Sequence, residues 1–159
     1  MARSGSTHPA GDPRPPAYRF RRAFPLADVP EPVRAGRDAT RQALTDLRWL
    51  PVGPNDPAGR HTRDDVLLMT AEILANACRH AGGPTDLRIL ATDDVLRIEV
   101  RDPHPSAPAL ALPRRPGHPG GYGLRVVHLL SDRWGTTRSL HGKAVWFEIG
   151  TERPGAALG

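Results

Sequence analysis

The stretch that decides the fold is residues 72–80, which read E-I-L-A-N-A-C-R-H and lie inside a longer segment with helical periodicity. The predicted helix covers 62–81 and ends at Gly82-Gly83-Pro84, a strong stop signal. The residues expected on its core face are Val66, Ile73, Leu74, Ala77 and Ala81. A long helix with one apolar face needs a second layer of structure to bury that face.

One face of this helix carries polar side chains of mixed charge. Glu72, Asn76, Arg79 and His80 stand at i, i+4, i+7 and i+8, which places them on one stripe. An amide oxygen suits Mg²⁺, and a carboxylate can orient or deprotonate a hydroxyl. The spacing alone also fits a solvated helix face without chemistry, so both interpretations stay open at this point.

The flanking sequence predicts one mixed domain. The predicted strands are 18–24, 86–91, 95–101, 134–140 and 143–149, and the other predicted helices are 32–50 and 124–132. Residues 51–60 are dense in turn residues and predict a loop. Helices grouped on one side of a mostly antiparallel sheet make an α+β two-layer sandwich. We expect this domain at 18–150, between a Pro- and Arg-rich tail at 1–17 and a second tail at 151–159.

Asp102 follows the predicted strand 95–101. In V-L-R-I-E-V-R-D the period of two puts the aliphatic residues on the core face, and it puts Asp102 there as well. A buried carboxylate needs hydrogen-bond donors, and the amino group of a heterocyclic ligand would supply one. An aspartate before Pro103 can equally begin a turn and bind local backbone, so two interpretations remain.

A Pro-rich segment at 103–119 separates that strand from a glycine turn. With six prolines in seventeen positions it cannot form a regular element, and a loop of this length is usually either a functional lid or disordered. Gly120-Gly121-Tyr122-Gly123 then opens the predicted helix at 124–132. Glycines at a helix start let backbone N–H groups approach an anion, and the helix dipole favours phosphate there; a flexible joint would look the same.

Composition excludes several classes of protein. The 159 residues carry 22 Lys+Arg and 17 Asp+Glu, a formal charge of +5, and one cysteine. One cysteine leaves no internal disulfide, and no stretch approaches the ~18 uncharged apolar residues of a membrane span. Residues 1–16 lack the apolar segment of a secretory signal, so we expect a cytoplasmic protein. Neither a Walker-type phosphate loop nor the glycine fingerprint of a Rossmann nucleotide site is present.

Three segments together resemble the histidine-kinase-like ATPase superfamily, which includes DNA gyrase. They are the run at 72–80, V-R-D-P at 100–103 and G-G-Y-G-L at 120–124. The resemblance spans about residues 20–149. The chain is most similar to the small single-domain branch of anti-sigma regulatory serine kinases and their actinobacterial relatives. This resemblance implies a Bergerat-type ATP-binding fold with ATP and Mg²⁺ as ligands.

The resemblance also implies roles for single residues. Asn76 would hold the Mg²⁺ that bridges the phosphates, and Glu72 would be the general base for the attacking hydroxyl. Asp102 would accept a hydrogen bond from the adenine amino group. The other residues expected at the nucleotide are Arg79, His80, Arg115, Gly121, Tyr122, Gly123 and Leu124. Residues 103–119 would be the ATP lid.

The chain departs from the family pattern at two points. P-H-P at 103–105 follows Asp102, where the larger family has D-x-G-x-G. Pro119 stands where kinase members have an arginine that contacts the γ-phosphate. A residue of the lid such as Arg115 would have to replace that arginine.

The resemblance therefore implies a regulatory protein serine/threonine kinase. Its partner would be a sigma factor, an anti-sigma-factor antagonist or both, and it would act as a homodimer. The alternative is a catalytically weak or inactive nucleotide-sensing module that binds a protein. Five arginines within residues 1–22 leave a third interpretation, a nucleic-acid-binding arm with steeply salt-dependent affinity. Aromatic residues are nearly absent among them, so we do not expect nucleic acid as the partner.

Overall fold

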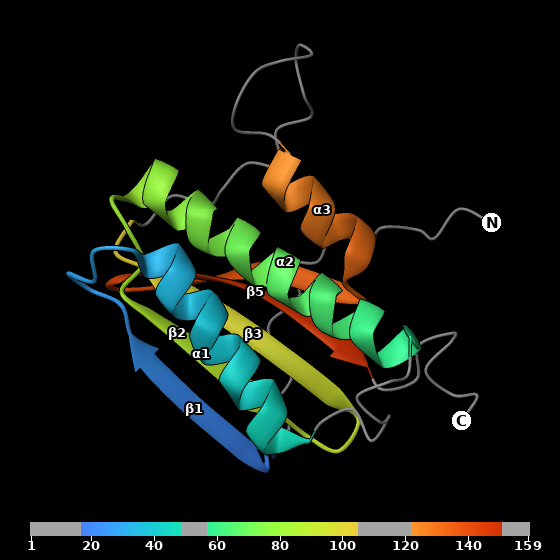
Figure 1. The fold of residues 1–159 in the computed structure, drawn as a ribbon. Coiled ribbons are helices and arrows are strands. Elements are labelled where there is room, and N and C mark those ends of the chain that lie inside the picture. The colour runs from blue at the N-terminus through green and yellow to red at the C-terminus, as the bar shows by residue number, and fades with distance from the viewer. Residues whose placement is uncertain (1–16, 49–56, 105–121, 151–159) are drawn as a thin grey trace.

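The computed structural model describes residues 17–48, 57–104 and 122–150 (Figure 1). Nearly all of the two predicted tails and most of the predicted lid lie outside these ranges, and so do Arg115 and Gly121. The side chains at 57–59 and at 122–123 are outside the description as well. The domain boundaries at 18–150 therefore stay a prediction.

Five strands form one antiparallel sheet with the spatial order β1-β2-β3-β5-β4. They are β1 (Phe20–Pro25), β2 (Asp86–Ala91), β3 (Val95–Asp102), β4 (Arg133–Ser139) and β5 (Gly142–Gly150). β2 and β3 form a hairpin, in whose turn the Thr92 hydroxyl accepts bonds from the N–H groups of Asp94 and Val95. β3 is the central strand; its last residue, Asp102, pairs with Lys143 of β5, whereas the pairing with β2 ends at Arg101.

The three helices are α1 (Pro32–Leu47), α2 (Pro57–Ala81) and α3 (Tyr122–Leu130). Figure 1 shows α1 and α2 side by side over one face of the sheet, with α3 on the other flank of α2. Helices on one face of an antiparallel sheet confirm the predicted α+β two-layer sandwich.

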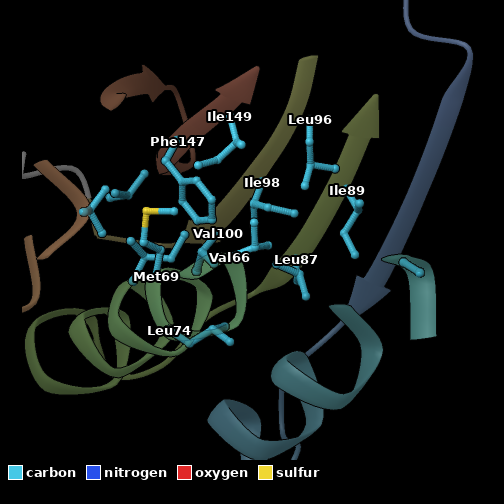
Figure 2. Packing of buried hydrophobic residues seen from close by; sticks show 14 of the residues in the cluster. Val66, Met69, Leu74, Leu87, Ile89, Leu96, Ile98, Val100, Phe147 and Ile149 are labelled. Atoms are coloured by element: carbon cyan, nitrogen blue, oxygen red, sulfur yellow. The ribbon is translucent and has the colours of Figure 1, made fainter. Parts of the chain in front are cut away.

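The hydrophobic core fills the space between the helices and the inward face of the sheet (Figure 2). Its largest fully buried side chains are Phe147, Met69, Ile73, Leu74, Leu87, Ile89, Leu96, Ile98, Ile149, Val66, Val100 and Val127. Each such side chain stabilises the fold by roughly 1.5–3 kcal/mol relative to exposure. Met69 was missing from the predicted core face of α2, and the predicted Ala81 is only half-buried.

Several element boundaries differ from the prediction. α2 begins at Pro57, so residues 57–60, predicted as the end of a loop, are helical. Proline suits the first turn of a helix, because the N–H that it lacks has no intrahelical partner there. Helix α1 ends at Leu47 and not, as predicted, at residue 50. The next residue, Arg48, has a left-handed backbone with φ 47°. α3 covers Tyr122–Leu130 instead of 124–132.

On the outer face of the sheet, opposite the helices, charged side chains are buried. Arg97 points to this face, as the period of two predicts, yet it is only 6% exposed. Its guanidinium bonds the carboxylates of Glu99 at 2.7 Å and Glu148 at 3.0 Å. Arg133 of β4 adds an ion pair with Glu148 at 3.3 Å. These ion pairs tie β3, β5 and β4 together across the outer face.

Candidate functional site

The C-terminal end of α2 and the end of β3 lie at the same end of the sandwich. The turn at Gly82 and Gly83, both with positive φ, leads from α2 into β2. Directly after it, the Thr85 N–H donates to the Arg101 carbonyl oxygen at 2.7 Å. Because Arg101 immediately precedes the last residue of β3, this contact holds the end of α2 and the end of β3 at one end of the fold (Figure 1).

The polar stripe on α2 is partly buried. Asn76 is 7% exposed and Glu72 is half-buried, whereas Arg79 and His80 are exposed. Within the described part of the chain, neither the Asn76 amide nor the Glu72 carboxylate has a hydrogen bond or an ion pair. The polar atoms of Asn76 still reach the surface. The Asn76 amide therefore lies at the edge of the core with its polar atoms accessible, where a ligand group can reach them.

Asp102 faces the helices and is 4% exposed, as the strand period predicts. Its Oδ1 accepts bonds from the Lys143 Nζ at 3.1 Å and from the His104 N–H at 2.9 Å. The side chain thus points inward, as the alternation predicts, and it also binds local backbone as a turn-starting aspartate does; its role toward a ligand stays a prediction. Its Oδ2 has no partner among the residues that the structure describes.

Lys143 is the residue of this site that the sequence interpretation missed. It pairs directly with Asp102 across β3 and β5, and the two side chains are 3% and 2% exposed. Its Nζ also donates to the His104 carbonyl oxygen at 3.4 Å. The signal was present in the sequence: the alternation that turns Val145 and Phe147 inward also turns Lys143 inward.

The start of α3 provides backbone donors at a helix N-terminus. Tyr122 and Gly123 lie in its first turn, and Leu124 is buried in the core at 6% exposure. The first four N–H groups of a helix have no intrahelical partner, and the dipole there favours an anion. Leu124 and Val127 anchor α3 on the core and so fix these donors. Gly121 and Arg115 lie outside the described residues.

The arginines before and within β1 make contacts inside the molecule. Arg19 pairs with Asp93 at 2.6 Å, and Arg22 pairs with Asp46 of α1 at 2.8 Å. The Arg21 guanidinium lies 5.3 Å from the centroid of the Tyr18 ring.

The described residues contain no cluster of three or more His, Cys, Asp or Glu side chains able to hold a metal ion. Mg²⁺ bound together with a nucleotide needs no such cluster, because phosphates and water supply most of its oxygen ligands. One amide oxygen, that of the largely buried Asn76, fits this requirement. In the same ranges, no helix has both the length and the apolar character needed to cross a membrane.

In a comparison with protein families, residues 54–149 match the histidine kinase-like ATPase domain. The chain belongs to this family. The matched region of the histidine kinase-like ATPase domain spans α2, α3 and all strands except β1. It includes Glu72 and Asn76 as well as the Asp102–Lys143 pair. No curated protein matches the chain.

Proposed function

We propose that this histidine kinase-like ATPase domain binds ATP with Mg²⁺ and phosphorylates a serine or threonine of a protein partner. The observation that carries the proposal is Asn76, a buried amide without a described partner, one helical turn from the half-buried Glu72. The inward-facing Asp102 at the same end of the fold supports binding of a base that carries an amino group.

Each residue has a defined task in this mechanism. When bound, ATP with Mg²⁺ supplies the transferable phosphoryl group and the cation that neutralises its charge. The Asn76 amide oxygen would hold the cation, and the N-terminal amides of α3 would face the phosphates. Glu72 would accept the proton of the attacking hydroxyl while the new O–P bond forms and the bond to ADP breaks. Asp102 would accept a hydrogen bond from the base.

The resemblance to anti-sigma regulatory kinases supports the choice of partner. On that basis we place the partner among sigma factors and anti-sigma-factor antagonists, with a cytoplasmic homodimer as the acting form. The internal pairing of Arg19 and Arg22 supports a protein partner over nucleic acid, because these charges already have counter-ions.

One observation favours a second function, a nucleotide-sensing module without useful phosphoryl transfer. Both the N–H and the carbonyl oxygen of His104 lie against the Asp102–Lys143 pair, at 2.9 Å and 3.4 Å. The larger family that the chain resembles has glycines after the aspartate, whereas in this chain P-H-P follows Asp102 and the His104 backbone occupies one of its oxygens. Pro119, in place of the family's arginine, supports the same conclusion.

Phosphate transfer from labelled ATP to a partner of the antagonist class separates the two functions. The variants are Glu72→Gln and, as a matched control, Asp64→Asn, which changes an exposed carboxylate about two turns earlier on α2. A kinase predicts that Glu72→Gln loses roughly 10²-fold or more of the transfer rate and keeps ATP affinity, while the control is unchanged. If the wild type binds ATP but no labelled partner protein is formed, the kinase proposal is overturned and the sensing module is supported.

A further inference from the structure

We propose that Lys143 determines base specificity: it makes Asp102 an acceptor for adenine and not for guanine. The inference rests on the proposed nucleotide binding and adds a residue to it. Lys143 is the single lysine of the chain, whose other cationic residues are all arginine. Nearly every cationic position is therefore filled by arginine, while this buried one beside Asp102 keeps an ammonium group.

The surroundings of Lys143 explain why an ammonium fits and a guanidinium does not. The Nζ has Asp102 Oδ1 at 3.1 Å and the His104 carbonyl oxygen at 3.4 Å as acceptors, and the side chain is 3% exposed. An ammonium has three donors on one atom, whereas a guanidinium has five donors spread over a planar fork. With two acceptors in reach, a guanidinium at this position would bury several donors without partners.

Lys143 changes the way in which Asp102 can bind a base. A carboxylate with two open oxygens accepts two parallel N–H bonds. In Asp102, the Lys143 Nζ and the His104 N–H both bond to Oδ1, so Oδ2 is the oxygen left for a ligand. The pair therefore offers one acceptor atom, whereas without Lys143 the Oδ1 atom would keep only the His104 N–H bond and regain a free lone pair beside Oδ2.

Purine bases differ in the number of donors that they present to such a group. Guanine presents two adjacent donors, the ring N1–H and the 2-amino group, and these match a carboxylate with two open oxygens. Adenine presents one exocyclic amino group, which matches Oδ2 alone. A buried donor left unpaired weakens binding, so the expected preference for ATP over GTP is roughly tenfold to a hundredfold.

The backbone fixes Lys143 in this position. Asp102 and Lys143 are register partners between β3 and β5, so their side chains leave the sheet on the same face. The preceding Gly142 has φ 144° and packs so closely on the Asp102 carbonyl that a Cβ atom would collide with it. The position of Nζ is therefore set by the sheet itself.

The test is a set of calorimetric titrations of the full chain with ATP, GTP and inosine triphosphate, which has the N1–H and lacks the 2-amino group. The variants are Lys143→Met, which removes every donor at nearly constant shape, and Lys143→Gln, which keeps an N–H for Oδ1. We expect the wild type to bind ATP at least tenfold more tightly than GTP, and GTP and inosine triphosphate within about twofold of each other. In Lys143→Met, GTP should gain about tenfold over inosine triphosphate, whereas Lys143→Gln should keep the wild-type ratios.

The outcomes separate this inference from the proposed function. A wild type that binds no ATP overturns both. A wild type that binds ATP but binds GTP tenfold more tightly than inosine triphosphate overturns the inference alone, as does an unchanged ATP-to-GTP ratio in Lys143→Met. That variant leaves a buried carboxylate without its cation, so circular dichroism must show that it folds. If it does not fold, the wild type and Lys143→Gln decide the question.

The single lysine also provides a direct spectroscopic probe. Selective ¹⁵N-lysine labelling gives one side-chain ammonium signal from the whole chain, that of Lys143. We expect this signal to shift when ATP binds, because a new bond to Oδ2 weakens the attraction of Asp102 for Nζ. A signal that stays unchanged at saturating ATP contradicts the inference.

Discussion

The Arg97 guanidinium carbon lies 3.9 Å from the centroid of the Trp146 ring, on the sheet face opposite the helices. Burial by itself lowers the pKa of Arg97, but the charge of Glu99 and the hydrogen bond to Glu148 outweigh this effect. The pKa of Arg97 therefore lies above its ordinary value, and the side chain remains a cation. A cation stacked on an aromatic ring and bonded to two carboxylates joins β3 to β5 without any helix above them.

Replacing Arg97 by methionine should lower the free energy of unfolding by about 3–5 kcal/mol, because it leaves the mostly buried Glu99 carboxylate without its cation and leaves Glu148 with Arg133 alone. Urea denaturation followed by circular dichroism measures the change. Arg88→Met is the matched control, since the Arg88 side chain is 40% exposed and, among the residues that the structure describes, pairs with Asp86 alone. That control should lose at most about 1 kcal/mol, and equal losses in both variants would contradict the account.

Gly142→Ala should destabilise the fold and weaken nucleotide binding together. A Cβ at this position would collide with the Asp102 carbonyl oxygen and would lie 2.8 Å from the Pro103 Cα. Gly82→Ala is the control, because Gly82 also has a positive φ, of 73°, but nothing lies within 4 Å of its Cβ position. We expect Gly82→Ala to lower the free energy of unfolding by about 1–2 kcal/mol from backbone strain alone. Gly142→Ala should lower it by a further ~1–3 kcal/mol because of the collision. Thermal denaturation that ranks the two variants equally would refute the close approach.

Gly36→Ala tests the contact between α1 and α2. A Cβ on Gly36 would lie 2.5 Å from Leu74 Cδ1, and Leu74 is fully buried. The gain of about 1 kcal/mol in helix propensity should be outweighed by ~1–3 kcal/mol of overpacking. Combining Gly36→Ala with Leu74→Val should cost less than the sum of the single changes in denaturant melts. Simple additivity, or a stabilised Gly36→Ala, would mean that the helices are not in contact at this point.

Asp46 should show a pH effect of defined sign. Hydrogen bonds from the Arg22 and Gln42 side chains hold the pKa of Asp46 below its usual 3.8. A carboxyl whose pKa is lowered by folding stabilises the protein above the unfolded value, and this contribution is lost as the pH falls through the folded value. Carbon-detected NMR should place the Asp46 midpoint below 3.8 in the wild type and closer to it in Arg22→Gln. The control Arg21→Gln should leave it unchanged, since Arg21 lies over Tyr18 and not near Asp46. If the Asp46 midpoint were the same in Arg22→Gln as in the wild type, the Arg22 hydrogen bond would not be the cause of the lowered pKa.

The sequence was most informative where the structure depends on local pattern. The strand Asp86–Ala91 has the predicted ends, and the inward direction of Asp102 follows from alternation along β3. Helical spacing placed Glu72, Asn76, Arg79 and His80 on one stripe of α2, but it did not distinguish the buried Asn76 from the exposed Arg79 and His80. Pro57 was read as part of a loop, although proline equally begins a helix.

The remaining features depend on partners that are distant in sequence. Arg97 was expected on the outer face, but its burial needs Glu148 and Trp146, about fifty residues later. The pairing of Asp102 with Lys143 likewise depends on β5 lying beside β3, which the order of elements alone does not specify. Alternation along β5 turns Lys143 inward, and the register between β3 and β5 then places it opposite Asp102.

The most direct measurement of the central claim is calorimetric titration of the full chain with ATP, with and without Mg²⁺. It compares the wild type with Asn76→Ala and with the control Asp64→Asn, after circular dichroism has shown that each variant folds. We expect Mg²⁺ to strengthen ATP binding in the wild type and the control, and we expect Asn76→Ala to lose this Mg²⁺-dependent gain. Absence of ATP binding at millimolar concentration, or an Asn76→Ala variant with undiminished Mg²⁺ dependence, would contradict it.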